Sequence, residues 1–173
     1  MLFRAICGLQ KPDRGMIDVN GSMVGQDHAF PGGIGVIIEN VGLWPDLTGY
    51  DTLKNLARIR NKIGSDDIRD SIARVGLNPD DKRAYKKDSL GMKQRLLIAQ
   101  AIMEKPELLI LDEPTNAMDE SGVNLLREII LLEHKRGATI LLASHNAEDI
   151  RILCDKVYYM RGGKLYEPSE EKE

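Results

Sequence analysis

Two adjacent carboxylates end the most constrained segment of the sequence, the run Leu-Leu-Ile-Leu-Asp-Glu-Pro at residues 108–114. An uninterrupted apolar run of this length is typical of a strand that is buried on both faces of a parallel sheet. In open α/β folds, ligands bind at the edge where the carboxyl ends of the strands meet. The run therefore predicts a core strand that presents Asp112 and Glu113 at a ligand-binding edge. A strand followed by a solvated acidic turn is the alternative.

The two acids suit two different tasks at such an edge. One carboxylate can hold a magnesium ion, directly or through water. The next can polarise a water molecule for attack on a phosphate. This is the Walker B arrangement of nucleotide triphosphatases, and it makes Asp112 and Glu113 candidates for these two tasks.

The rest of the chain alternates between strand-like and helical segments, which predicts a mostly parallel sheet covered by helices on both faces. Between about residues 45 and 95 the sequence becomes polar and helical, with opposite charges at helical spacing in Asp66–Arg69 and Asp70–Arg74. This change indicates a helical insertion in an α/β frame. The predicted strands are 16–19, 33–38, 108–111, 139–143, 156–160 and 164–166, and the predicted helices are 1–7, 52–60, 66–75, 91–103, 120–136 and 147–153.

Two further segments carry groups that suit a phosphate. Ser89 and Gly91 open a predicted helix, where a hydroxyl, a glycine and a helix N-terminus together can bind an anion. The alternative for Ser89 is a simple helix cap. His145 directly follows the strand 139–143, so it faces the same sheet edge as the two acids and can hydrogen-bond a terminal phosphate. The alternative is a structural histidine.

Composition excludes several classes of protein. The net charge is −3 and basic residues are scattered, which gives no electrostatic case for nucleic-acid binding. Cys7 and Cys154 lack metal-ligand spacing and indicate free thiols in a reducing cytosol. No apolar run approaches the roughly 18 residues of a membrane span, and the first residues do not resemble a signal peptide. These observations favour a cytoplasmic protein.

Taken in order, the segments resemble the ATP-binding cassette (ABC) family over nearly the whole chain. The resemblance implies an α/β fold of the P-loop NTPase (RecA-like) type, with a mostly parallel sheet flanked by helices and an inserted α-helical subdomain. It divides one cassette domain, residues 1–173, into a core and a helical subdomain. The core comprises residues 1–44 and 96–173, and the helical subdomain about residues 45–95.

The resemblance also assigns roles at the sheet edge. Asp112 resembles the Walker B acid that holds Mg²⁺, and Glu113 resembles the catalytic glutamate that orients or deprotonates water. His145 resembles the switch histidine that senses the γ-phosphate of ATP. ATP and Mg²⁺ are therefore the implied cofactors.

Three other residues resemble parts that act between two cassettes. Ser89 and Gly91 resemble the signature pair that reaches across a dimer to the partner's γ-phosphate. Asp119 resembles the acid of the D-loop, which couples the two cassettes. The implied partners are a second cassette, in a homodimer or heterodimer, and a membrane permease on a separate chain.

The sequence departs from the usual family pattern at two places. The family signature usually reads Leu-Ser-Gly-Gly-Gln, whereas Asp-Ser-Leu-Gly-Met stands at residues 88–92. The form Ser-Leu-Gly-Met-Lys-Gln resembles the bacterial cassettes of bacitracin-resistance and lantibiotic-immunity exporters. At the glutamine-loop position stands Glu39, which would contact the cofactor and hold magnesium or water. A solvated acid at the end of a strand is the alternative for Glu39.

The printed residues contain no Gly-x-x-x-x-Gly-Lys-[Ser/Thr] loop, the Walker A motif that cradles phosphates. In the family, residues resembling 1–8 come directly after this loop. The expectation is that the native gene encodes the loop before Met1. A second expectation is that these 173 residues alone bind ATP weakly.

The resulting interpretation is an ATP-hydrolysing subunit of a bacterial export complex. The subunit would lie in the cytoplasm at the inner face of the cell membrane and be held there only through its permease. The alternative is a non-catalytic, truncated cassette that serves as an interaction module for a permease or a partner cassette.

Overall fold

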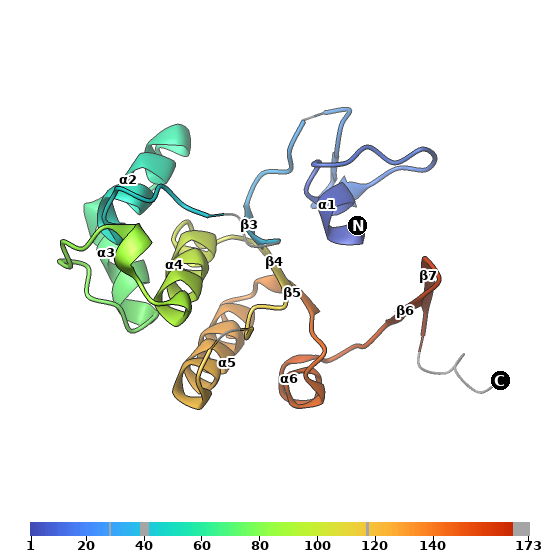
Figure 1. The fold of residues 1–173 in the computed structure, drawn as a ribbon. Coiled ribbons are helices and arrows are strands. Elements are labelled where there is room, and N and C mark those ends of the chain that lie inside the picture. The colour runs from blue at the N-terminus through green and yellow to red at the C-terminus, as the bar shows by residue number, and fades with distance from the viewer. Residues whose placement is uncertain (28, 39–41, 117, 168–173) are drawn as a thin grey trace.

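A three-stranded parallel sheet forms the centre of the molecule. The computed structural model describes residues 1–27, 29–38, 42–116 and 118–167. The sheet has the order β3 (Ile34–Ile37), β4 (Leu108–Asp112) and β5 (Thr139–Ala143), so β4 lies in the middle (Figure 1). Leu108 lies opposite Ile34 on one side and Thr139 on the other. The α/β prediction with a parallel sheet flanked by helices is confirmed.

The strand β4 contributes apolar side chains to both faces of the sheet, because successive strand residues point in opposite directions. Leu109 and Leu111 join the larger apolar cluster together with Ile37 of β3. Leu108 and Ile110 join a smaller cluster on the opposite face. Burial on both faces explains why this strand is an unbroken apolar run and shows no alternation.

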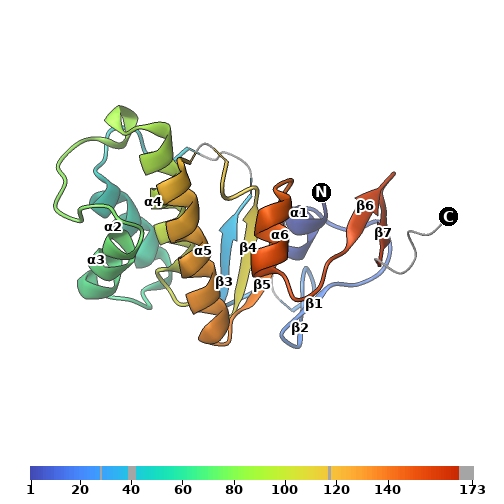
Figure 2. The same ribbon diagram turned by 90° about the horizontal axis from the view of Figure 1, so that it is seen from below.

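Helices cover the two faces unequally. The helices α4 (Leu90–Ile102) and α5 (Glu120–Lys135) lie on one side of the sheet. The short helix α1 (Leu2–Ile6) lies on the other side (Figure 2), where Phe3 and Ile6 pack on the smaller cluster. That cluster also contains Val19 of a small antiparallel hairpin, formed by β1 (Asp18–Val19) and β2 (Ser22–Met23). The helix α6 (Ala147–Leu153) follows β5 and packs against α5.

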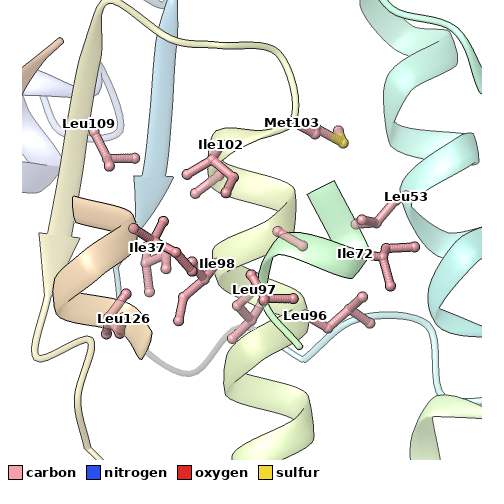
Figure 3. Packing of buried hydrophobic residues seen from close by; sticks show 14 of the residues in the cluster. Ile37, Leu53, Ile72, Leu96, Leu97, Ile98, Ile102, Met103, Leu109 and Leu126 are labelled. Carbon is pink, nitrogen blue, oxygen red and sulfur yellow. The ribbon is translucent and has the colours of Figure 1, made fainter. Parts of the chain in front are cut away.

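The helix α4 is the bridge between the sheet and the helical segment. Figure 3 shows Ile98 and Ile102 near Ile37 of β3, while Leu96 lies toward the helices α2 (Gly49–Arg60) and α3 (Ser65–Arg74). Because α4 is buried on two sides, it carries apolar residues around most of its circumference. Residues 75–89, which include the short 3-10 turn η1 (Tyr85–Lys87), connect α3 to α4.

The charged pairs of the helical segment differ from the expectation. Arg69 pairs with Asp80 at 2.7 Å, and Arg74 pairs with the buried Glu133 of α5 at 2.6 Å. The local partners Asp66 and Asp70 were expected from helical spacing alone. Burying an unpaired carboxylate costs more free energy than leaving one exposed. The pair of Arg74 with the buried Glu133 is therefore favoured over a pair with the exposed Asp70.

The last two strands form a separate antiparallel hairpin. The strand β6 (Tyr159–Arg161) begins three residues later than predicted, and β7 (Lys164–Tyr166) matches its prediction. Lys156 and Tyr158 come before the first residue that pairs, because the register joins Tyr159 to Tyr166 across the two glycines of the turn. Within the described residues, no helix combines the length and the apolar character needed to cross a membrane.

A substitution at Gly35 of β3 tests how closely α4 packs on the sheet. A Cβ atom there would collide with the carbonyl oxygen of Ala101 and lie 2.9 Å from Cγ of Pro106. Overpacking of this kind typically costs about 1–3 kcal/mol. We therefore expect Gly35→Ala to lower the free energy of unfolding by that amount in urea denaturation.

Gly42→Ala is the matched control, since no heavy atom of the described residues lies within 4 Å of a Cβ at Gly42 and its φ is not positive. It should leave the unfolding midpoint nearly unchanged. Equal effects of the two substitutions would contradict the close approach of β3 and α4.

Candidate functional site

The carboxyl ends of β4 and β5 bring three predicted residues to one edge of the sheet. Asp112 is the last residue of β4 and lies opposite Ala143, the last residue of β5. The next residue, Glu113, continues the pairing, because its backbone N–H donates to the carbonyl oxygen of Ala143 at 2.9 Å. His145 follows two residues after Ala143. Parallel pairing in register therefore places the two acids and the histidine side by side.

Glu113 and His145 are in direct contact. Nε2 of His145 lies 3.4 Å from Oε1 of Glu113, and the imidazole is 99% exposed while the glutamate side chain is 24% exposed. Glu113 has a φ of +48°, which is uncommon for a residue other than glycine. Its carbonyl oxygen accepts from the N–H of Asn116 at 3.2 Å, which closes a tight turn. The turn leaves a carboxylate and an imidazole together at an open edge, where a ligand can reach both.

Asp112 suits a magnesium ion by the chemistry of its donor. Its carboxylate has no hydrogen-bond or ion-pair partner among the described residues and is partly exposed at the strand end. Mg²⁺ takes oxygen ligands, keeps several waters, and is often held by one or two carboxylates plus the phosphates of a substrate. The described residues contain no group of three or more metal-ligating side chains. Glu39, the other predicted ligand, lies outside the described residues.

Ser89 and Gly91 lie at the start of α4, in the helical part of the molecule. Ser89 is the N-cap, and its hydroxyl accepts from the N–H of Met92 at 3.2 Å. The capping role that was the alternative for Ser89 is therefore present. In the described part of the chain, no hydrogen bond or ion pair joins Ser89 or Gly91 to Asp112, Glu113 or His145. The two groups of predicted phosphate ligands thus lie on different parts of one chain.

Asp119 caps the helix α5. Its carboxylate accepts from the N–H of Gly122 at 2.9 Å and from the hydroxyl of Ser121 at 3.0 Å. These two hydrogen bonds, in that order, hold the pKa of Asp119 below its ordinary value, and the positive charge of Arg95 adds to the effect. The guanidinium of Arg95, on α4, lies 3.5 Å from the carboxylate. Asp119 therefore links the start of α5 to the helix that begins at Ser89.

The sequence interpretation missed the residues that hold the segment after the two acids. The side-chain amide of Gln94 donates to the carbonyl oxygen of Pro114 at 3.0 Å, and the hydroxyl of Thr115 donates to Asp149 at 2.9 Å. Arg127 pairs with the same buried aspartate. Gln94 stands beside the predicted signature and could have been noticed there. Asp149 carries no such signal, since an acid in the first turn of a helix is ordinarily a solvated one.

Comparison with known proteins shows which family this chain resembles. The sequence profile described as ABC transporter matches residues 1–116. An uncharacterised ABC transporter ATP-binding protein of Bacillus subtilis (strain 168) is 50% identical over 171 residues, which is 99% of this chain and 78% of that protein. A bacitracin transport ATP-binding protein of Enterococcus faecalis is 40% identical over 81% of this chain and 46% of that protein. A lantibiotic transport ATP-binding protein of Streptococcus pyogenes is also 40% identical, over 81% of this chain and 63% of that protein.

Among solved structures, a dimeric ATP-binding cassette in a post-hydrolysis state, bound to ADP and Pi, superposes with a TM-score of 0.83. Its sequence identity is 17%, and the match covers 96% of this chain and 78% of that one. This match shows the fold. The chain spans about half to two thirds of the length of the bacitracin and lantibiotic relatives.

Substitutions of Ser89 measure how much its hydrogen bond to Met92 contributes to stability, independently of any role in nucleotide binding. Replacing an N-cap serine by alanine typically costs about 1 kcal/mol, while aspartate caps as well as serine does. We expect Ser89→Ala to lower the free energy of unfolding by about that amount and Ser89→Asp to preserve it, both by urea denaturation. If Ser89→Ala unfolds at the parent midpoint, the bond to Met92 contributes nothing to stability.

Proposed function

We propose, because the chain belongs to the ABC transporter family as an ATP-binding subunit, that the edge formed by Asp112, Glu113 and His145 hydrolyses ATP. The observation that carries the proposal is the contact between Glu113 and His145 at the ends of neighbouring parallel strands. In this proposal Glu113 orients or deprotonates the attacking water, and His145 donates a hydrogen bond to the γ-phosphate.

Magnesium is the cofactor that this edge would use. Asp112 and the phosphate oxygens of ATP would hold Mg²⁺, which would neutralise part of the phosphate charge. The carboxylate of Asp112 is available for this, since it is partly exposed and has no partner among the described residues. Glu113 then keeps its separate task, because its carboxylate faces the imidazole of His145.

We propose further that a second cassette completes the site. Ser89 caps α4 and Gly91 lies in its first turn, and in the described residues no hydrogen bond or ion pair joins either of them to the two acids. Two chains that faced each other would allow the signature pair of one to meet the nucleotide held by the other. The similar solved cassette is a dimer, which supports this arrangement.

The coupled process that we propose is export through a separate permease at the inner face of the cell membrane. The names of the bacitracin and lantibiotic transport proteins support it. We also propose that residues 45–95 form the helical subdomain of the cassette, since α2 and α3 lie on the side of α4 that faces away from the sheet.

Glu113→Gln tests the proposed reaction in the protein expressed from its complete gene. The substitution removes only the group that activates water, and such groups typically contribute about 10²–10⁴-fold to rate. We expect ATP hydrolysis to slow by that factor while ATP binding, measured by calorimetric titration, is retained. The variant should then accumulate as an ATP-bound dimer in size-exclusion chromatography.

Glu128→Gln is the matched control, an exposed acid on α5 away from the sheet edge, and it should hydrolyse ATP at the parent rate. Hydrolysis by Glu113→Gln at the parent rate would show that Glu113 is only a strand-end acid. A parent protein that binds its permease but never hydrolyses ATP would favour the interaction module instead.

A further inference from the structure

The carboxylate of Asp149 is fully buried, although it lies only four residues after the exposed His145. Its two oxygens have different partners. Oδ1 accepts from Nε of Arg127 at 2.8 Å and from Nη2 of the same residue at 2.6 Å. Oδ2 accepts from the hydroxyl of Thr115 at 2.9 Å. One oxygen is therefore occupied by a cation on α5, and the other faces the loops at the sheet edge.

These loops are the two that carry the proposed catalytic residues. Thr115 lies two residues after Glu113, and Ser144 lies immediately before His145. The hydroxyl of Ser144 makes a longer contact, 3.4 Å, with the same Oδ2 of Asp149. That hydroxyl also accepts from the N–H of Asn146 at 3.0 Å. Oδ2 of Asp149 thus accepts hydrogen bonds from hydroxyl groups of both loops.

We propose that Asp149 is a positioning residue that holds the Glu113 loop and the His145 loop at a fixed separation. The hydrogen bond from Thr115 fixes one loop, and the contact with Ser144 fixes the other. Arg127 holds the carboxylate in place through its two contacts with Oδ1. The catalytic consequence of this proposal rests on the proposed function, whereas the structural link between the loops does not.

The geometry of the edge shows why such a link is needed. His145 is almost fully exposed, so its contact with Glu113 cannot by itself hold the two loops together. Glu113 adopts a left-handed backbone conformation, which persists only when the surroundings enforce it. The Glu113 loop is held on one side by Gln94 of α4, through the carbonyl oxygen of Pro114. Asp149 holds it on the other side, from the start of α6.

The charge of Asp149 explains how a buried acid can serve as this anchor. A buried carboxylate is costly unless it is paired and hydrogen-bonded. The positive charge of Arg127 satisfies the first requirement and the two hydroxyl groups satisfy the second. Hydrogen bonding with Asp149 correspondingly raises the pKa of Arg127 above its ordinary value.

Thr115→Val is the sharpest test, because it deletes one hydroxyl with little change of shape and leaves the buried pair of Asp149 and Arg127 intact. Amide hydrogen exchange, followed by NMR in the protein expressed from its complete gene, reports on both loops. The N–H of Glu113 donates to Ala143, and the N–H of Asn146 donates to Ser144. We expect Thr115→Val to speed exchange about fivefold at Glu113 and also at Asn146, as the loss of one hydrogen bond implies.

Three companion variants separate positioning from general destabilisation. Thr115→Ser retains the hydroxyl and should exchange like the parent. Ser144→Ala should speed exchange at Glu113, across the link in the opposite direction. Glu148→Gln removes another ion pair of Arg127, 3.0 Å long. Within the described ranges no hydrogen bond or ion pair joins the Glu148 side chain to either loop, so both amides should remain at the parent rate. If Thr115→Val and Ser144→Ala each loosen only their own loop, the proposed link is overturned.

Steady-state ATP hydrolysis measures the catalytic consequence. A small misplacement of reacting groups can cost about 10²-fold in rate. We expect Thr115→Val to lower kcat by up to that factor with KM for ATP unchanged, the pattern of an interaction made only in the transition state. Thr115→Ser should restore kcat. An unchanged kcat in Thr115→Val would overturn the positioning role, whereas absence of hydrolysis in the parent would overturn the proposed function and leave the exchange measurement to decide the link.

Discussion

Burial of β4 on both faces is the constraint on which the rest of the structure depends. Residues 108–111 pair in parallel with both β3 and β5, and their side chains fill apolar clusters above and below the sheet. Pairing with a neighbour on each side sets the register of this strand. The register that results also places Asp112 and Glu113, the proposed metal ligand and catalytic acid, next to the end of β5.

Three side-chain contacts from the helices α4 and α6 support the proposed site at this edge. Gln94 reaches the carbonyl oxygen of Pro114 from α4, and Asp149 reaches Thr115 from α6. Arg95 extends from α4 to the carboxylate of Asp119, the cap of α5. The segment between the two acids and α5 is therefore bonded to helices on both sides. The helix α4, which Ser89 caps, also carries Gln94 and Arg95. One helix therefore links the proposed signature to the proposed catalytic edge.

The sequence predicted those features that depend on local pattern. The strand 108–111 was evident from its apolar run, and the position of His145 followed from the strand before it. Features that depend on tertiary packing were not predictable. The segment Asn-Ala-Glu-Asp at residues 146–149 reads as an ordinary acidic start of a helix, and nothing in it distinguishes the exposed Glu148 from the buried Asp149. Likewise, Arg74 was paired with a helix neighbour by spacing, whereas the buried Glu133 is its partner. A serine at the start of a helix is expected both for a helix cap and for a phosphate ligand. The sequence alone therefore does not distinguish these two roles of Ser89.

The most direct test of the central claim is a structure of the protein expressed from its complete gene, in the Glu113→Gln form, with Mg²⁺ and ATP. The account predicts the γ-phosphate between the edge residues Asp112, Gln at position 113 and His145 of one chain, and the start of α4 in a second chain. Ser89 of that second chain should lie within hydrogen-bond distance of the phosphate. Nucleotide bound away from this edge, or bound there with Ser89 facing solvent in every chain, would contradict the account.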